Sequence, residues 1–276
     1  MSLSKLFGKQ DGSPTLKDRI KNGELGRFAG PITLGGHISQ HKDRHADLFK
    51  GTLNTSLSSW KASQQTVIIK TYNVDNNNTL ERVIKVCTGL LDFRRNGAHR
   101  RCSQRIKREA DLWKSLKHPN IAEFLGVCYH KSFDAAGIVS PWYSNGTLSV
   151  FLKNNPDIDK LGMASVYGIA SGLDYLHRLT IVHGDLNPEH SIMVLDNGQP
   201  ALVDFGRSKN LSRSGYTTKA SSTSDLYRAP ELVDEYGIEG SNSPYTTQQD
   251  VYSFGMTMLF VGVVSVLGYS SCGADN

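Results

Sequence analysis

The chain has 276 residues with 38% hydrophobic and 21% charged side chains, so it can form a hydrophobic core and has room for one two-lobed domain or two small ones. The formal net charge of +5 is mild, and we interpret the basic cluster within residues 94–108 as a solvated helix face rather than a surface for nucleic acid or acidic lipid. The four cysteines have no paired spacing, which argues against a zinc site and favours a reducing compartment.

The first half of the chain is predicted to be rich in β-structure. Residues 1–27 have little periodicity and no sustained apolar core, so we expect a flexible leader without a secretory signal. After Gly36 come segment 46–51 and the strand-like run Thr66-Val-Ile-Ile-Lys-Thr-Tyr72. Residues 73–100 have no clear assignment, and a regulatory insertion and translated non-coding sequence both stay open.

Helices become more frequent further along the chain. A helix over residues 104–116 would place Ile106, Ala110, Trp113 and Leu116 on one face, with Pro119 as the breaker that follows it. Strands are expected at 124–129 and 137–140, and further helices at 161–179 and 246–256. The apolar run 254–267 is too short to cross a bilayer and predicts a buried helix. We therefore expect a cytoplasmic, intracellular protein that binds neither membrane nor nucleic acid.

Two aspartates lie at the ends of short aliphatic segments in the middle of the chain. Asp185 follows Ile181-Val-His-Gly, and Asp204 follows Ala201-Leu-Val. Between them, residues 194–203 form a predicted hairpin that turns at Asn197-Gly198. A hairpin brings its ends together, so both carboxylates should face one small volume. One could orient a hydroxyl while the other holds a cation, as phosphoryl transfer requires.

These segments resemble motifs of the eukaryotic protein kinase family. His183-Gly-Asp185 resembles its catalytic loop, Asp204-Phe-Gly206 its metal-binding motif, and Ala229-Pro-Glu231 the end of its activation segment. The resemblance implies an α+β, two-lobed kinase-like fold over about 28–262, with a β-rich lobe to about 140 and a helical lobe from 141. It ends before the family's last three helices, so the helical lobe is expected to be truncated and 263–276 to be an atypical tail.

The resemblance also implies ATP and Mg²⁺ as ligands and assigns residues to them. Asp185 matches the catalytic aspartate, and Asn187, which stands where Ser/Thr kinases have a lysine, is the second residue expected at the catalytic position. Asp204 matches the magnesium ligand. Counting from Asp185 places His190 at the second metal position, whereas counting back from Asp204 places Ser191 there. Asp250 would cap the backbone of the catalytic loop. The implied nucleotide-binding residues are Lys70 on its strand, its partner Glu109, Gly36, the gatekeeper Ser140, and the hinge residues Trp142 and Tyr143.

Several positions depart from the family pattern, and three functions stay open because of them. The glycine-rich loop has few glycines, Ile68 occupies the small-residue position above adenine, and Asn187 carries no charge. The first function is an ATP-dependent protein kinase that phosphorylates a protein substrate. The second is a pseudokinase that acts as a binding or scaffold module for a protein partner. A small-molecule phosphotransferase is a third, against which Ala229-Pro-Glu231 argues.

Overall fold

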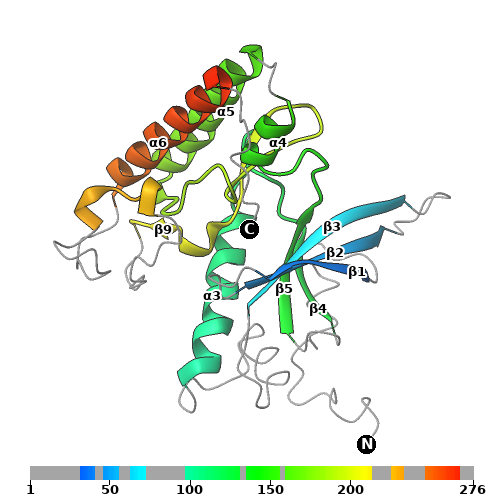
Figure 1. Cartoon of the computed structure of the whole chain (residues 1–276). Coiled ribbons are helices and arrows are strands. Elements are labelled where there is room, and N and C mark those ends of the chain that lie inside the picture. Colours follow the sequence, from blue (N-terminus) through cyan, green and yellow to red (C-terminus); the bar gives the residue numbers. More distant parts are fainter. Residues whose placement is uncertain are drawn as a thin grey trace, which may run out of the picture. The chain divides into compact units, whose positions relative to one another are not determined.

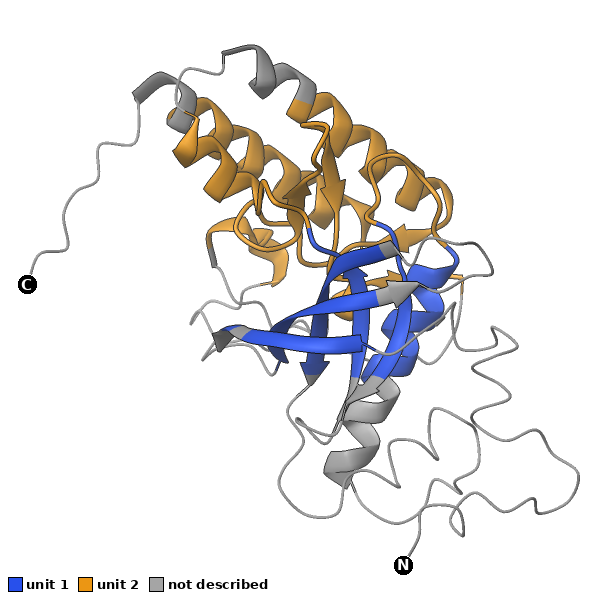
Figure 2. Cartoon of the chain, turned by 90° about the vertical axis from the view of Figure 1, so that its right-hand side faces the viewer, with its two compact units in different colours: residues 1–115, 123–142 blue, residues 116–122, 143–276 orange. Residues whose placement is uncertain are grey.

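The computed structural model describes residues 32–40, 46–55, 63–72, 97–130, 135–155, 159–212, 225–232 and 246–267. The chain divides into two compact units, which are coloured separately in Figure 2. Unit 1 contains residues 1–115 and 123–142, and unit 2 contains residues 116–122 and 143–276. Each unit is described by itself below.

Unit 1 is built on an antiparallel sheet of five strands in the order β1-β2-β3-β5-β4 (Figure 1). The strands are β1 (Ile32–Gln40), β2 (Ala46–Thr55), β3 (Ser63–Tyr72), β4 (Gly126–His130) and β5 (Ala135–Pro141). Between Leu34 and His37 the register of β1 on β2 shifts, so Gly35 and Gly36 lie in a bulge. Strand pairing then continues to Gln40, which is paired with Asp47.

One buried hydrophobic cluster of unit 1 lies on one face of this sheet. Side chains alternate along β3, so Val67 and Ile69 are fully buried together with Val139, while Ile68 and Lys70 point to the opposite face. Gly137 on β5 is required by close packing, because a Cβ there would lie 2.5 Å from Cγ2 of Ile69.

The helix α3 (Gly97–Lys114) belongs to unit 1 and packs on β4 and β5. Its predicted apolar face is confirmed, since Ile106, Ala110 and Trp113 are buried, as is Leu116 just beyond its end. The helix ends four residues before His118-Pro119, in agreement with the expected breaker.

In the residues of unit 2 that the structure describes, three helices are combined with two short strand pairs. The helices are α4 (Leu148–Asn154), α5 (Asp159–Arg178) and α6 (Thr247–Leu267), and α5 and α6 lie side by side (Figure 1). Thr147 begins α4, because its Oγ1 accepts a hydrogen bond from the Val150 amide at 3.3 Å. Short 3-10 turns occur at η2 (Phe205–Arg207), η3 (Asp225–Tyr227) and η4 (Pro230–Leu232).

The predicted hairpin is present in unit 2 as β7 (Ile192–Val194) paired with β8 (Pro200–Leu202). Its turn contains Gly198 with φ of +81°, a backbone conformation that glycine adopts without strain. A second pair joins β6 (Ile181–Val182) to β9 (Lys209–Asn210). These two pairs hold the ends of the segments that carry Asp185 and Asp204.

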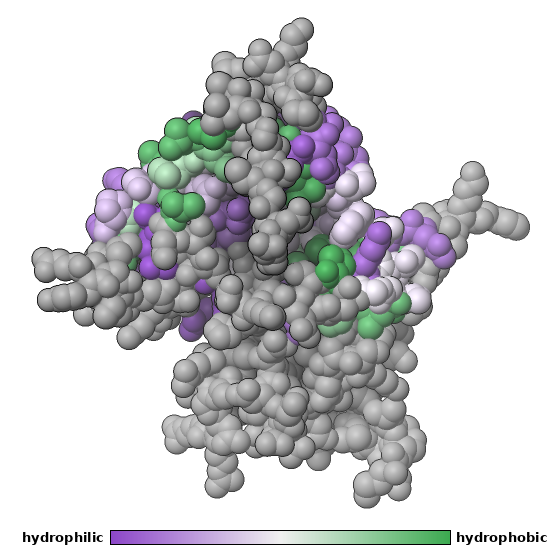
Figure 3. All heavy atoms as spheres, in the orientation of Figure 1, coloured by the Kyte–Doolittle hydropathy of each residue, from purple (hydrophilic) through white to green (hydrophobic). Residues whose placement is uncertain are grey.

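One face of α6 is apolar and open to solvent. Val251, Leu259 and Val263 are 57%, 58% and 45% exposed, and hydrophobic residues gather over this helix in Figure 3. Within the described ranges, no helix is both long and apolar enough to cross a membrane.

The structure confirms the α+β class, the strand at 66–72, the helix at 104–116 and the hairpin. The leader 1–27, the segment 73–96, the serine-rich segment 213–224 and the tail beyond 267 lie outside the described residues. The predicted domain boundaries stay predictions.

Replacing Ile69 by Ala should destabilise unit 1 by about 2–5 kcal/mol, because the side chain is fully buried and its loss leaves a cavity. The matched control is Ile38→Ala in β1, where the side chain is 41% exposed and the cost should stay below about 1 kcal/mol. Urea unfolding of both variants measures the difference. Equal midpoints would show that the core has been assigned to the wrong face of the sheet.

Candidate active site

The loop that follows β6 is anchored by one buried carboxylate from α6. Asp250 is 1% exposed, and its Oδ2 accepts a hydrogen bond from the His183 amide at 2.7 Å while its Oδ1 accepts one from the Gly184 amide at 2.8 Å. Nε2 of His177, on α5, lies 2.9 Å from the same Oδ2. The capping contact predicted for Asp250 is therefore present, and it joins two helices to the loop.

His183 braces the inside of the loop. Its ring is fully buried and packs 5.5 Å from the ring of Phe205, measured between centroids. The Asp185 amide donates to Nδ1 at 3.3 Å, so Nδ1 is the acceptor, and Nε2 carries the proton that it donates to the Val203 carbonyl at 3.0 Å. The His183 carbonyl in turn accepts from the Ser208 hydroxyl at 2.9 Å. These bonds connect the Asp185 segment to the Asp204 segment.

Asn187 is enclosed within the loop's own hydrogen bonds. It is 2% exposed, and its Oδ1 accepts from the Glu189 amide at 2.7 Å. The hydroxyl of Ser191 accepts from the Asn187 amide at 2.7 Å and donates to the Asn187 carbonyl at 3.0 Å. Nδ2 of Asn187 is buried without a partner among the described residues. The catalytic role expected for Asn187 stays a prediction, and its observed contacts lie inside the loop.

Asp204 has an unusual backbone conformation. Its φ of +64° and ψ of +67° lie in the left-handed region, which costs free energy for a residue other than glycine and is concentrated at functional sites. Its Oδ1 accepts from the Gly206 amide at 3.3 Å. The Val203 amide donates to the Ser191 carbonyl at 2.9 Å, which holds the preceding residue beside the loop.

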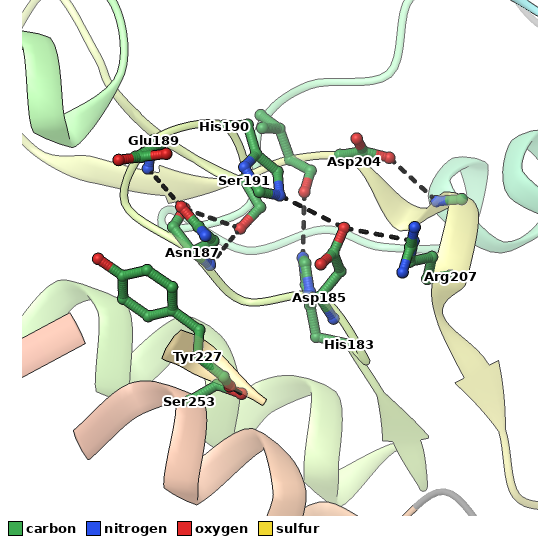
Figure 4. Close-up of polar contacts among 12 residues, drawn as sticks. His183, Asp185, Asn187, Glu189, His190, Ser191, Asp204, Arg207, Tyr227 and Ser253 are labelled. Carbon is green, nitrogen blue, oxygen red and sulfur yellow. Dashed lines mark hydrogen bonds and ion pairs between the residues drawn. The ribbon is translucent and has the colours of Figure 1, made fainter. Parts of the chain in front are cut away.

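The imidazole of His190 and the guanidinium of Arg207 both contact one oxygen of Asp185 (Figure 4). Nε2 of His190 lies 3.3 Å from Oδ2, and Nε of Arg207 lies 3.4 Å from the same atom. Burial and the charge of Asp204 raise the pKa of the Asp185 carboxyl, but the hydrogen bond from His190 and the Arg207 charge outweigh them and hold the pKa below its usual range. Asp185 is therefore ionised at neutral pH, although its side chain is only 12% exposed.

Unit 1 contains a separate buried ion pair. Nζ of Lys70, on β3, donates to Oε1 of Glu109, on α3, at 3.0 Å. The Glu109 side chain is completely buried and that of Lys70 is 14% exposed. The contact expected between these two residues is thus present, while their binding of nucleotide stays a prediction.

The other residues expected to bind nucleotide lie on strands of unit 1 or just after β5. Ser140 is buried and is paired in register with Ile68 across β3 and β5. The Trp142 amide donates to the Thr66 carbonyl at 3.0 Å, so that donor is already used by the sheet. At Gly36 a Cβ would meet no atom within 4 Å, which leaves space beside the backbone. Tyr143 follows Trp142 and belongs to unit 2.

The oxygen donors of unit 2 fit a magnesium ion held by one carboxylate. Mg²⁺ is usually bound through one or two carboxylates plus substrate phosphates, and Asp204 supplies a suitable oxygen ligand. His190 offers a nitrogen, which this ion rarely takes, and the nitrogen already contacts Asp185. The described residues contain no group of three or more His, Cys, Asp or Glu side chains that could hold a metal by themselves.

A family model described as protein kinase domain matches residues 58–265, most of the 276-residue chain. The chain belongs to the protein kinase family. This range contains the Lys70–Glu109 pair and the whole of the Asp185 loop. Kinase membership supports a protein kinase function and agrees with the α+β architecture, in which an antiparallel sheet precedes a mainly helical part.

Curated kinases from distant organisms are similar to the chain. It is 32% identical over 166 residues to the dual specificity protein kinase zakA of Dictyostelium discoideum, covering 54% of this chain and 20% of that protein. It is 28% identical over 182 residues to the serine/threonine/tyrosine-protein kinase HT1 of Arabidopsis thaliana, covering 64% and 44%. It is 31% identical over 156 residues to the human dual specificity testis-specific protein kinase 2, covering 55% and 26%. The chain spans less than half the length of each.

Arg207 is the residue that the kinase motifs did not single out. It directly follows Asp204-Phe-Gly206, and only the fold of η2 turns its side chain toward Asp185. The available signal in the sequence was a charged residue directly after Asp204-Phe-Gly206.

Asp250→Ala should destabilise unit 2, because it leaves the His183 and Gly184 amides without an acceptor, at about 1–3 kcal/mol for each buried donor. Asp174→Ala is the matched control: Asp174 is 60% exposed and pairs with Arg178 at i,i+4, so its loss should cost about 0.3–0.5 kcal/mol. Chemical denaturation of the two variants measures the contrast. Similar losses from both would mean that Asp250 does not anchor the loop.

Proposed function

We propose that the chain is an ATP-dependent protein kinase that transfers the γ-phosphoryl group to a hydroxyl of a protein substrate. The observation that carries the proposal is the Lys70–Glu109 ion pair, with Nζ to Oε1 at 3.0 Å. In protein kinases such a lysine–glutamate pair must be in place, together with an aspartate that holds magnesium, before transfer can occur.

The burial of Glu109 supports this interpretation. A completely buried carboxylate is costly to desolvate, and a buried ion pair is weak support for stability alone. Lys70 keeps 14% of its side chain exposed, so its ammonium is fixed in direction by Glu109 while it retains access to a ligand. An ammonium held in this way suits a phosphate oxygen, with Gly36 leaving room for the approach of a ligand.

In unit 2, Asp185 is proposed to orient the substrate hydroxyl. Its Oδ2 is held by His190 and Arg207, and Oδ1 has no hydrogen bond or ion pair among the described residues. The hydroxyl oxygen would form a bond to the γ-phosphorus while the bond from phosphorus to the bridging oxygen breaks, and its electron pair leaves with ADP. The hydroxyl proton would pass to Asp185. Because its pKa is low, Asp185 would act more through orientation than through basicity.

Asp204 is proposed to hold the magnesium ion, which would neutralise phosphate charge when bound. His190, the second predicted ligand, could join it only by releasing Asp185. Ser140, Trp142 and Tyr143 are proposed to border adenine. ATP as substrate and the unpaired cysteine spacing favour a cytoplasmic, intracellular location.

A pseudokinase that binds protein partners is the second candidate, and the position of Asn187 favours it. A side chain enclosed in the loop and without charge cannot assist the γ-phosphate as a lysine would. Ile68 adds bulk on the same sheet face as Lys70. Overpacking of about 1–3 kcal/mol would weaken nucleotide binding roughly 10- to 100-fold. Nucleotide binding and turnover must therefore be measured separately.

Lys70→Met should abolish the stabilisation of the protein by Mg-ATP, because the phosphate loses its cation. A thermal-shift titration measures this, since a ligand at 100 times its Kd stabilises the native state by about 2.7 kcal/mol. Lys153→Met, an exposed position on α4, is the control and should retain the shift. An unchanged shift in Lys70→Met would remove Lys70 from the nucleotide site.

Asp185→Asn should lower turnover by about 10²- to 10⁴-fold while Mg-ATP binding persists, because the hydroxyl loses its carboxylate partner. Radiolabelled phosphate transfer to a generic protein substrate gives the rate, and thermal shift gives the binding. Turnover that survives in Asp185→Asn would point to a contaminating kinase. Nucleotide binding without turnover in the wild-type chain would favour the pseudokinase.

A further inference from the structure

The guanidinium of Arg207 contacts Asp185 through Nε, and its two Nη groups can still donate hydrogen bonds to another group. Its side chain is 14% exposed, and Nε lies 3.4 Å from Oδ2 of Asp185. Within the described residues, this ion pair is the only polar contact of the guanidinium. Neither Nη atom is among the buried atoms without a partner, so both Nη groups retain access to solvent. The guanidinium is thus oriented by Asp185 while its terminal donors are uncommitted.

The negative charges of Asp185 and Asp204 would disfavour a phosphoryl group bound nearby unless a cation offsets them. Asp185 and Asp204 are two carboxylates close enough for the charge of one to raise the pKa of the other. A phosphoryl group carries negative charge, so it would be repelled by Asp185 and by the part of the Asp204 charge that a bound magnesium ion does not neutralise. Asn187 supplies no charge and is enclosed in the loop, so the position at which Ser/Thr kinases have a lysine cannot offset that repulsion. In the described part of the chain, Arg207 is the only Lys or Arg in ion-pair contact with Asp185.

Arginine is well suited to such a ligand. Its planar guanidinium presents parallel N–H donors that match two oxygens of a phosphate, and it stays charged at all accessible pH values. With Nε directed at the carboxylate, the terminal donors remain for a second anion. One side chain can therefore bind Asp185 and a phosphate simultaneously.

We propose that Arg207 binds the transferring phosphoryl group of ATP and supplies the positive charge that Asn187 lacks. The inference rests on the proposed function, because it takes the γ-phosphoryl group of ATP as the ligand. The competing interpretation is that Arg207 masks Asp185 and inhibits transfer. The two interpretations predict different results. In the first, removal of Arg207 weakens binding of the γ-phosphoryl group, and in the second it raises turnover.

The test compares Arg207→Met with Arg178→Met. Arg178 also pairs with an aspartate oxygen through Nε, at 2.9 Å to Oδ2 of Asp174, but it is 79% exposed on α5. Calorimetry measures the affinity of each folded protein for Mg-ADP alone and for Mg-ADP with beryllium trifluoride, which mimics the γ-phosphoryl group. We expect wild type and Arg178→Met to bind the mimic complex more tightly than Mg-ADP.

Arg207→Met should keep its affinity for Mg-ADP and bind the mimic complex about 10- to 100-fold more weakly than wild type, as expected for loss of a charge-assisted contact. Arg207→Lys keeps the positive charge but not the parallel donors of the guanidinium, so it should lose less affinity for the mimic complex. It replaces Arg207→Met if that variant does not fold. An unchanged affinity for the mimic complex, or a turnover that rises in Arg207→Met, would overturn the proposal.

A wild-type chain that does not bind Mg-ADP at all would refute the proposed function, and inorganic phosphate then tests Arg207 independently. Titration followed by ³¹P NMR should show phosphate binding to wild type and Arg178→Met that is lost in Arg207→Met. Equal binding to the three proteins, or binding to none, would overturn the assignment of Arg207.

Discussion

The arrangement of unit 2 depends on Asp250, whose carboxylate accepts two backbone hydrogen bonds. Its oxygens receive the amides of His183 and Gly184 at 2.7 and 2.8 Å. The loop after β6 is irregular, so it has no ladder of its own to satisfy these donors. A buried carboxylate from α6 replaces that ladder, and it fixes the direction in which the chain leaves β6. The side chain of Asp185 takes its position from this anchor, and so do the contacts that reach it.

The same region contains backbone and side-chain features that cost free energy and that a purely structural segment would avoid. Asp204 has a left-handed backbone, and Nδ2 of Asn187 is buried without a partner among the described residues. Each of these features costs free energy, and natural proteins tolerate such departures chiefly where function requires them. By contrast, the core of unit 1 around Ile69 follows simple alternation and shows no such strain. The contrast supports the location of the candidate active site independently of the motifs.

Much of this arrangement could be predicted from the sequence, because it follows from periodicity and turn chemistry. The hairpin at Asn197-Gly198 and the buried face of α3 are of this kind. The contact between Lys70 and Glu109 was instead expected from the resemblance to protein kinases. The contacts of Asp185 could not be predicted, since they depend on how η2 turns one side chain. His190 was expected to be a metal ligand from its count along the chain. Counting along an irregular loop does not say where a ring points, and this ring contacts Asp185.

Both units use one charged group to orient another. In unit 1 a completely buried carboxylate, Glu109, holds the ammonium of Lys70, and in unit 2 the partly exposed guanidinium of Arg207 holds the carboxylate of Asp185. Hydrophobic residues of similar volume would often stabilise a fold as well as a buried ion pair does, so stability alone is a weak reason for either pair. In the first pair, 14% of the Lys70 side chain stays exposed. In the second, the terminal nitrogens of Arg207 and Oδ1 of Asp185 have no hydrogen bond or ion pair among the described residues. Charges that are fixed in direction but not fully neutralised are what a phosphoryl group requires from its surroundings. The ion pairs therefore connect the folding of each unit to the chemistry proposed for it.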